Sequence, residues 1–420
     1  MESAILIHLS RNQKEKYDAE ESMRELKGLV RTAGAHITAE IFQYRPQINP
    51  KFLIGEGKVE ELIQIKDESG ADLIVFDHNL TPAQLRSLED RIQAKVIDRT
   101  QLILDIFAQR ARSKEGKLQV ELAQLNYLLP RLLGKGKALS RLGGGIGTRG
   151  PGEKKLEEDR RRIQGRIQKI KEEISKIQKR RAEQRKAREK RPLPLVSLVG
   201  YTNAGKSTLF NQLSRTQMFT SSQLFATLDP VLRRAYFNDG LSFYLTDTVG
   251  FIKNLPVELI TAFKATLEEI KEADCICHVI DITSDQYERQ INAVETILSE
   301  IGISDIPVIN VFNKIDLCAN SKELLLKNYP KNLNSVYISA HEGEGIRTLK
   351  DCLHKILFRD FKLYYLIVPK NRKDLISSFP KWAIVIKRRE NTDSYEFKIM
   401  AKPQHMLNFL PYLKRGEEKW

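Results

Sequence analysis

The clearest chemical function that this sequence predicts is phosphate binding, by the run from Gly200 to Ser207. Its order, Gly-Tyr-Thr-Asn-Ala-Gly-Lys-Ser, fits the pattern G-x-x-x-x-G-K-[ST]. Glycine lets the backbone wrap closely around a phosphate, Lys206 would reach the β- and γ-phosphates, and the Ser207 hydroxyl would ligate Mg²⁺. The residues predicted to contact a nucleotide here are Gly200, Tyr201, Thr202, Asn203, Ala204, Gly205, Lys206, Ser207 and Thr208.

The elements on either side of this run are those that a phosphate loop needs. Residues 195–199 form a short apolar, β-branched run that predicts a buried strand, and residues 207–213 begin with a capping type and continue with helix formers. Strand, loop and helix N-terminus together direct backbone N–H groups and the positive end of the helix dipole at one point. This context favours an anion-binding loop over a plain glycine-rich turn.

A second motif predicts which base the site accepts. Asn313, Lys314 and Asp316 follow the predicted strand 307–312, at the strand end where open α/β sheets bind ligands. The Asp316 carboxylate can accept hydrogen bonds from guanine N1–H and from its 2-amino group. Adenine offers an acceptor at N1 and no amine, so the carboxylate would stay unpaired. The alternative is an ordinary charged loop after a strand; downstream of a phosphate loop, guanine recognition is the favoured interpretation.

The remaining parts of a GTP-hydrolysing site lie between and after these two motifs. Asp247 would hold Mg²⁺ through water, Thr227 would close on Mg²⁺ when a γ-phosphate is present, and the Gly250 N–H would bond that phosphate. We therefore expect Ser207, Thr227 and Asp247 as metal ligands and Lys206, Thr227 and Gly250 as catalytic groups. Further nucleotide contacts are expected from Phe225, Ala226, Leu228, Asp229, Thr248 and Val249, and Ser339 and Ala340 would back the guanine ring.

One position departs from the Ras-like pattern. Ras-like enzymes place a glutamine directly after D-x-x-G to orient the attacking water, whereas this chain has Phe251 there, which can neither donate to water nor accept from it. Arg233 and Arg234 are weak candidates for an arginine finger. The sequence thus predicts a slow intrinsic GTPase that a partner completes or accelerates.

Two separate motif blocks resemble the HflX family of ribosome-associated GTPases. One is the GTPase set, with G-Y-T-N-A-G-K-S-T-L-F-N, F-A-T-L-D-P and D-T-V-G-F-I; the other spans residues 125–132, 142–153 and 159–163. The resemblance covers roughly residues 1–360. It implies GTP hydrolysis with Mg²⁺ and association with the large ribosomal subunit, in ribosome splitting, rescue, protein synthesis or biogenesis. In some members the N-terminal domain is linked to an ATP-dependent RNA-remodelling activity.

The composition of the chain indicates the cellular compartment in which the protein acts. The four cysteines form no C-x-x-C pair, and Cys275 and Cys277 lie in an apolar run, so buried thiols are expected rather than zinc ligands or disulfides. The N-terminus lacks a signal peptide, and no stretch of 18 apolar residues is present. We therefore expect a cytoplasmic protein, monomeric in solution.

The net charge of +15 is concentrated outside the predicted GTPase region. Residues 113–192 hold 24 Lys and Arg against 10 Asp and Glu, a net charge of +14, whereas residues 193–360 hold 16 against 20, a net charge of −4. GTP binding does not need such a basic segment, but a polyphosphate partner does.

The basic segment is predicted to form a helical hairpin. Leucines recur at helical spacing over residues 117–133, and Ile163, Ile167, Ile170, Ile174 and Ile177 mark a heptad seam. The connecting residues 134–152 hold eight glycines, four basic residues and no acid, which suits contact with folded RNA. An ordinary solvated helix pair is the alternative. The RNA-contacting candidates are Arg131, Lys135, Lys137, Arg141 and Arg149, and the family resemblance also implies ribosomal RNA.

These patterns predict an α/β protein of four parts. Residues 1–112 are a small α/β domain with a parallel sheet, and residues 113–192 are the basic hairpin with its glycine-rich loop. Residues 193–360 are a P-loop GTPase domain with a doubly wound sheet, and residues 361–420 are a small basic α+β module. We expect Gly55-Glu-Gly57 to begin a helix rather than to bind a nucleotide. The alternative function is a GTP-dependent RNA-binding or signalling switch that does not act on ribosomes.

Overall fold

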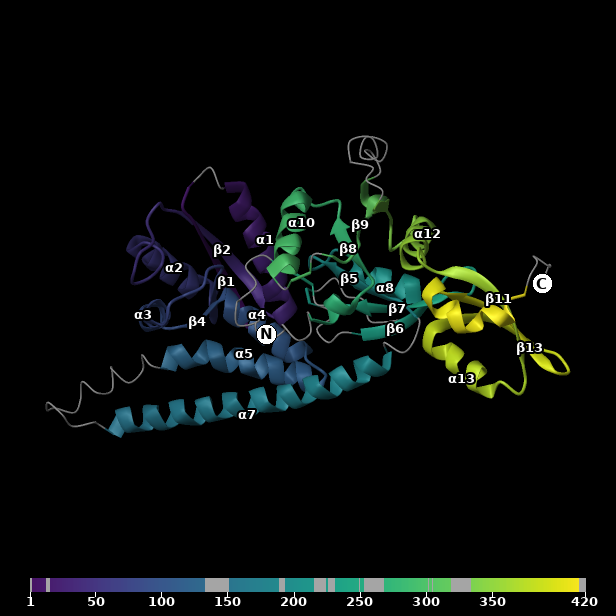
Figure 1. The fold of residues 1–420 in the computed structure, drawn as a ribbon. Coiled ribbons are helices and arrows are strands. Elements are labelled where there is room, and N and C mark those ends of the chain that lie inside the picture. The colour runs from purple at the N-terminus through teal and green to yellow at the C-terminus, as the bar shows by residue number, and fades with distance from the viewer. Residues whose placement is uncertain are drawn as a thin grey trace. The chain divides into compact units, whose positions relative to one another are not determined.

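The structure is a computed structural model, and it describes residues 2–12, 16–132, 151–188, 193–214, 224–225, 231–248, 250–252, 268–300, 302–303, 305–318 and 334–414. The chain divides into two compact units. The first comprises residues 1–176 with 221–229 and 254–264, and the second comprises residues 177–220, 230–253 and 265–420. Figure 1 shows the elements of each unit along the chain.

The first unit contains the predicted parallel sheet. Its strands are β1 (Ser3–Ser10), β2 (His36–Tyr44), β3 (Leu73–Phe76) and β4 (Lys95–Asp98), in the spatial order β2-β1-β3-β4 and all parallel. The helices between them are α1 (Lys16–Ala33), α2 (Glu56–Ser69) and α3 (Pro82–Ile92), and α4 (Arg99–Arg110) follows β4. As expected, α2 begins directly after Gly55.

Strand β2 lies at the edge of this sheet. Its side chains alternate between exposed and half-buried from His36 to Glu40, so it lacks the continuous apolar run by which the buried strands β1 and β3 are recognised. Helix α4 is also hard to recognise in the sequence, because its apolar residues form a nearly unbroken run that periodicity alone cannot assign.

Two long helices form the predicted hairpin. Helix α5 (Lys114–Leu132) and helix α7 (Pro151–Arg188) lie side by side. Ile167, Ile170 and Ile174 on the heptad seam are buried, while the Arg166 guanidinium makes a bidentate ion pair with Glu121 of α5 at 2.6 and 2.8 Å. The glycine-rich connection at 133–150, including Lys135, Lys137, Arg141 and Arg149, lies outside the described residues.

The second unit contains a six-stranded sheet that carries the predicted nucleotide motifs. Its order is β10-β9-β8-β5-β7-β6, and only the edge strand β6 is antiparallel to its neighbour. The strands are β5 (Leu195–Gly200), β6 (Val231–Tyr236), β7 (Ser242–Asp247), β8 (Cys275–Asp281), β9 (Val308–Asn313) and β10 (Ser335–Tyr337). The helical segments are α8 (Lys206–Ser214), η2 (Glu268–Glu272), α10 (Tyr287–Glu300), η3 (Ile315–Cys318) and α12 (Ile346–Leu357).

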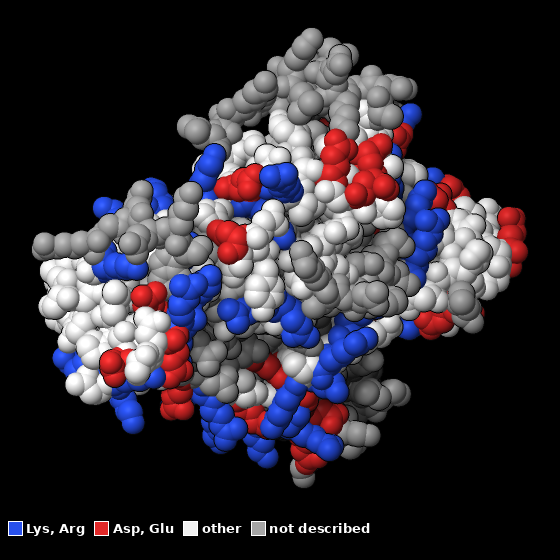
Figure 2. All heavy atoms as spheres, turned by 90° about the vertical axis from the view of Figure 1, so that its right-hand side faces the viewer, with Lys and Arg blue, Asp and Glu red and all other residues white. Residues whose placement is uncertain are grey.

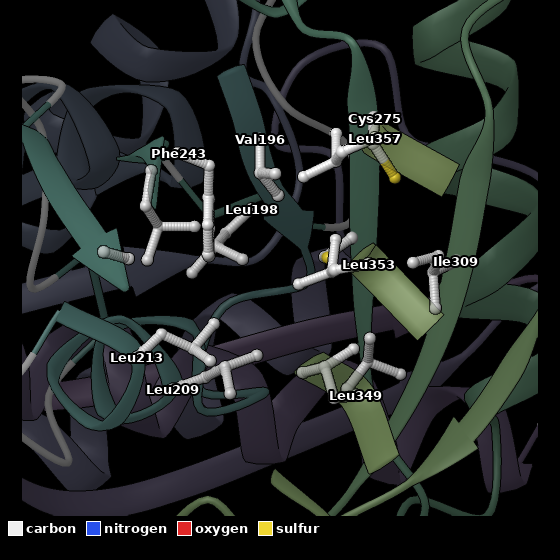
Figure 3. Packing of buried hydrophobic residues seen from close by; sticks show 14 of the residues in the cluster. Val196, Leu198, Leu209, Leu213, Phe243, Cys275, Ile309, Leu349, Leu353 and Leu357 are labelled. Carbon is white, nitrogen blue, oxygen red and sulfur yellow. The ribbon is translucent and has the colours of Figure 1, made fainter. Parts of the chain in front are cut away.

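Helices cover both faces of this sheet, as a doubly wound fold requires. On one face, Leu209 and Leu213 of α8 and Leu349, Leu353 and Leu357 of α12 pack against strand residues such as Val196 and Ile309 (Figure 3). On the other face, Val294 and Leu298 of α10 pack against Val199 and Ile276. Cys275 and Cys277 are buried free thiols on β8, in agreement with the sequence analysis.

The last part of the chain is an antiparallel sheet with two helical segments. The strands β11 (Lys362–Pro369), β12 (Ala383–Glu390) and β13 (Ser394–Ala401) have the order β11-β13-β12, and α13 (Lys373–Trp382) and η4 (Pro403–Tyr412) supply Phe379, Met406 and Phe409 to the core between them. The predicted α+β module is thus present, although its final helix is a 3-10 helix. The module belongs to the same compact unit as the GTPase sheet.

Candidate nucleotide-binding site

The predicted phosphate loop connects β5 to α8, as the sequence requires. Gly200 and Gly205 adopt φ values of 147° and 95°, in the region that glycine enters without strain. A β-carbon on Gly200 would overlap the Val279 carbonyl of β8, and one on Gly205 would overlap the Asn313 amide. Both glycines are therefore needed for the loop to approach the strands that carry the other motifs.

The ammonium of Lys206 is enclosed by this loop. Its Nζ donates to the carbonyl oxygens of Gly200 at 3.0 Å and Tyr201 at 2.7 Å, and the residue is 7% exposed. Burial lowers the pKa of Lys206 to about 8, and the nearby Asp247 carboxylate only partly opposes that shift. A buried ammonium whose charge is only partly balanced by a carboxylate can bind a polyanion such as a chain of phosphates.

Two oxygen donors meet beside the start of α8. The Ser207 hydroxyl donates to Asp247 Oδ2 at 2.8 Å, and Asp247 at the end of β7 is fully buried. A hydroxyl and a carboxylate at this separation suit a hard cation such as Mg²⁺, which is commonly held by one or two protein groups together with phosphate and water oxygens. The third predicted ligand, Thr227, lies outside the described residues, as do Ala226, Leu228, Asp229 and Val249.

Asn313 joins the two halves of the predicted site. Its Nδ2 donates to the Ala204 carbonyl at 2.8 Å, and its Oδ1 accepts from the Ala340 N–H at 2.9 Å. The residue is 2% exposed, so both sides of its amide are used in the interior. The structure thereby brings the phosphate loop, the Asn313 motif and the Ser339–Ala340 turn to the same end of the sheet.

An ion pair and a hydrogen bond hold two of the residues that we expect to contact guanine. Lys314 has a positive φ of 69°, and its Nζ pairs with Asp281 Oδ2 at 2.5 Å. Asp316 is half-buried in η3, and the Ser339 hydroxyl accepts from the Glu342 N–H at 3.0 Å. The sequence analysis missed the pairing role of Asp281; its position at the end of β8, another parallel strand of this sheet, was the available signal.

The segment after β7 is paired with the phosphate loop. Thr248 donates its hydroxyl to the Leu198 carbonyl at 2.6 Å, which fixes the start of the segment. Beyond it, the Phe251 N–H donates to the Gly200 carbonyl at 3.0 Å, and the Thr202 N–H donates to the Phe251 carbonyl at 2.7 Å. The Phe251 side chain is 2% exposed among Val199, Ile270 and other apolar residues, so it cannot reach an attacking water.

Two residues contact protein groups in the structure: Phe225, which was predicted to contact the nucleotide, and Arg131, which was predicted to contact RNA. Phe225 belongs to the first unit, where its ring lies edge-on against Phe107 with centroids 4.5 Å apart. Arg131 donates to Asp98 Oδ2 at 3.1 Å and to the Leu80 carbonyl at 3.0 Å, and it stacks over Tyr127. Its side chain is 16% exposed. Because its charge is already neutralised inside the unit, we withdraw Arg131 from the RNA-contacting set.

A doubly wound sheet with a glycine-bounded phosphate loop at a strand end, a buried lysine and an Asn-Lys-x-Asp turn defines a P-loop GTPase. Comparison with known proteins identifies the family. Residues 20–108 match the family described as GTP-binding GTPase N-terminal, residues 110–188 the GTP-binding GTPase Middle Region, and residues 195–314 the 50S ribosome-binding GTPase family.

Individual relatives agree with these matches. The chain is 49% identical to GTPase HflX of Caldanaerobacter subterraneus subsp. tengcongensis over 83% of this chain and 80% of that protein. It is 44% identical to GTPase HflX of Escherichia coli over 90% of this chain and 88% of that protein. A GTP-binding protein from Sulfolobus solfataricus, solved with GDP, is 27% identical over 86% of this chain and 99% of that one, with a TM-score of 0.46. The chain belongs to the HflX family of GTPases.

Proposed function

We propose that this GTPase acts on the large ribosomal subunit and that its task is ribosome splitting, rescue or biogenesis. The observation that carries the proposal is the match of residues 195–314 to the 50S ribosome-binding GTPase family, in a chain that also has a basic hairpin. No helix of the described residues is long and apolar enough to cross a membrane. We also propose that the protein acts in the cytoplasm as a monomer.

The roles that we propose for the site follow from its geometry. Lys206 and the N–H groups of the loop would bind the phosphates, and Ser207 and Asp247, together with Thr227, would hold Mg²⁺, which supplies charge neutralisation at the β- and γ-phosphates. Asp316 would bind guanine beside the Asn313 and Ala340 contact. Gly250 would present its N–H to the γ-phosphate.

The hairpin supplies the proposed RNA surface. On α7, Ile167, Ile170 and Ile174 of the heptad seam are buried, whereas Arg160, Arg161 and Arg162 are exposed. On the face that Figure 2 shows, Lys and Arg lie among Asp and Glu, so net charge alone does not identify a partner. An exposed run of arginines next to a buried apolar seam can bind RNA phosphates. Lys135, Lys137, Arg141 and Arg149 remain our candidates in the connecting loop.

Co-sedimentation with purified large subunits tests this function. We expect the protein to pellet with subunits in the presence of a non-hydrolysable GTP analogue and much less with GDP. Large subunits should also raise GTP turnover by at least about tenfold, because Phe251 stands where Ras-like enzymes have the glutamine that positions water. Equal turnover with and without subunits would favour the RNA-binding or signalling switch.

A double variant separates specific binding from general attraction. Arg141→Ala with Arg149→Ala should weaken the stimulation by subunits and reduce its salt dependence, while basal hydrolysis stays unchanged. The matched control replaces two exposed arginines outside the loop, Arg31 and Arg359, with alanine. If both double variants lose the same amount of stimulation, the loop has no special role.

A further inference from the structure

Lys314 lies in the turn between the two residues expected to hold the guanine end of the nucleotide, Asn313 and Asp316. Its backbone is left-handed, with a φ of 69°. A residue with a long side chain rarely adopts this conformation, which persists where the surrounding structure imposes it. The turn at Lys314 takes the chain from the end of β9 into η3, so its conformation determines where Asp316 lies.

Backbone hydrogen bonds hold the chain on both sides of this turn. The Asn313 carbonyl accepts from the Ile282 N–H at 3.2 Å, and the Lys314 carbonyl accepts from the Leu317 N–H at 3.1 Å. These bonds join the turn to the residue after β8 and to η3. They do not involve the long side chain of Lys314, which is placed by a contact of its own.

That contact is an ion pair with Asp281. The Lys314 ammonium lies 2.5 Å from Asp281 Oδ2, and the two side chains are 22% and 18% exposed. In the part of the chain that the structure describes, no other carboxylate lies within ion-pair distance of Lys314. A pair that is largely shielded from solvent is screened less than a surface pair, so Asp281 restrains the lysine effectively.

Asp281 is itself held in place by hydrogen bonds. Its Oδ1 accepts from the Thr283 N–H at 3.0 Å and from the Thr283 hydroxyl at 2.6 Å, which leaves Oδ2 for the lysine. Asp281 and Asn313 are also register partners at the ends of the neighbouring strands β8 and β9. The carboxylate therefore comes from a rigid element beside the turn, as a group that positions another residue should.

We propose that Asp281 is a positioning residue for base recognition. Through its ion pair with Lys314 it stabilises the left-handed turn that places Asp316 at guanine. This role depends on the proposed binding of guanine by Asp316. Loss of the Asp281 carboxylate relaxes the turn and weakens the hydrogen bond from the guanine 2-amino group to Asp316, whereas Lys206 and Ser207, at the phosphate end of the site, keep their contacts.

The preference for GDP over inosine diphosphate tests this proposal. Inosine lacks only the 2-amino group, so the ratio of the two affinities measures how well Asp316 is placed. Asp281→Asn removes the charge and keeps an oxygen for Thr283. We expect it to lower the ratio and to raise the KM for GTP by at least about threefold each, part of what one hydrogen bond to a charged group contributes, with kcat unchanged within about twofold. An unfolded fraction lowers both affinities alike and leaves the ratio unchanged.

A double-mutant cycle shows whether Asp281 acts through Lys314. Lys314→Met removes the ammonium and keeps most of the stem. Each single variant and the double variant should lower the ratio by the same factor, within about twofold. Asp274→Asn is the matched control, because Asp274 directly precedes β8 at its opposite end and accepts from the Leu195 N–H at 2.7 Å; this variant should leave the ratio unchanged.

An unchanged ratio in Asp281→Asn would overturn the proposal. Losses that add in the double variant would also overturn it, because they would mean that Asp281 does not act through Lys314, and so would an equal loss in Asp274→Asn. A wild-type protein with no preference for GDP over inosine diphosphate would instead refute the binding of guanine by Asp316, and with it the role of Asp281.

Discussion

The backbone N–H of Thr202 donates to the carbonyl oxygen of Phe251 at 2.7 Å. This bond ties the phosphate loop to the segment that follows Asp247. It also directs the Phe251 side chain into the apolar cluster around Ile270, Val294 and Leu298, away from the phosphates. In place of the glutamine, this chain has a phenylalanine whose backbone is bonded to the phosphate loop and whose ring packs in the core.

Restoring glutamine at this position should fail for that reason. We expect Phe251→Gln to leave basal GTP turnover no faster than in the wild type and to lower the free energy of unfolding by about 3 kcal/mol, since it removes a buried ring and buries an amide. Phe251→Leu is the matched control and should cost less than about 2 kcal/mol. Thermal unfolding and single-turnover hydrolysis measure the two effects; accelerated turnover in Phe251→Gln would contradict this account.

Nucleotide binding should depend on pH through Lys206. Burial lowers the pKa of Lys206 to about 8 in the nucleotide-free site, whereas bound phosphates favour the charged form, so binding takes up a proton above that pH. GDP affinity should therefore be level below about pH 7.5, fall by about fivefold between pH 8 and 9, and fall more steeply above that. Titration of a fluorescent GDP analogue checks this.

Lys206→Arg provides the control for that titration. Arginine keeps its charge throughout this range, so whatever affinity the variant retains should vary much less with pH. The same slope in both proteins would mean that another group titrates. In the nucleotide-free protein the sign is opposite: the unfolded chain binds the Lys206 proton more tightly, so this residue makes stability rise with pH between about 8 and 10.

Base selection by Asp316 can be reversed. In Asp316→Asn an amide N–H₂ replaces an acceptor oxygen, so the 2-amino group of guanine faces a donor at a cost of about 1–3 kcal/mol. Xanthine has an oxygen at that position and should now be accepted. We expect GTP affinity to fall and xanthosine triphosphate to be preferred in competition binding. Retention of the wild-type preference for GTP would remove the main argument that Asp316 reads the base.

Arg131 should matter for folding. It pairs with Asp98, which is fully buried and also accepts from the N–H groups of Leu80 and Gln101 at 3.1 and 2.9 Å. Arg131→Met leaves that carboxylate without its cation, and we expect the first unit to lose about 3 kcal/mol of stability. Denaturation followed by hydrogen exchange at the Leu80 amide measures the loss.

The exposed ion pair of the hairpin is the matched control for Arg131. Arg166 pairs with Glu121, and both side chains are more than one-third exposed, so Arg166→Met should cost less than about 1 kcal/mol. A similar loss in both variants would indicate that helix contacts rather than the buried carboxylate determine the effect.

The sequence by itself determined the features of this protein that neighbouring residues form. A phosphate loop is made of backbone that only glycine can follow, a strand before it and a helix after it, so Gly200 to Ser207 were recognisable from neighbouring residues alone. The same holds for the Asn313 motif, the buried strands β1, β5 and β8, and the heptad seam of α7, because burial imposes a period on adjacent positions.

Only the tertiary structure decided which distant groups share a space. Nothing beside Arg131 in the sequence indicates that Asp98 neutralises it, and nothing beside Asn313 shows that its amide joins Ala204 to Ala340. The edge strand β2 has little buried surface and hence little apolar pattern. The approach of Asp281 to Lys314 depends on strands β8 and β9 lying next to each other. Such contacts join positions far apart in the chain, and residue type alone does not specify them.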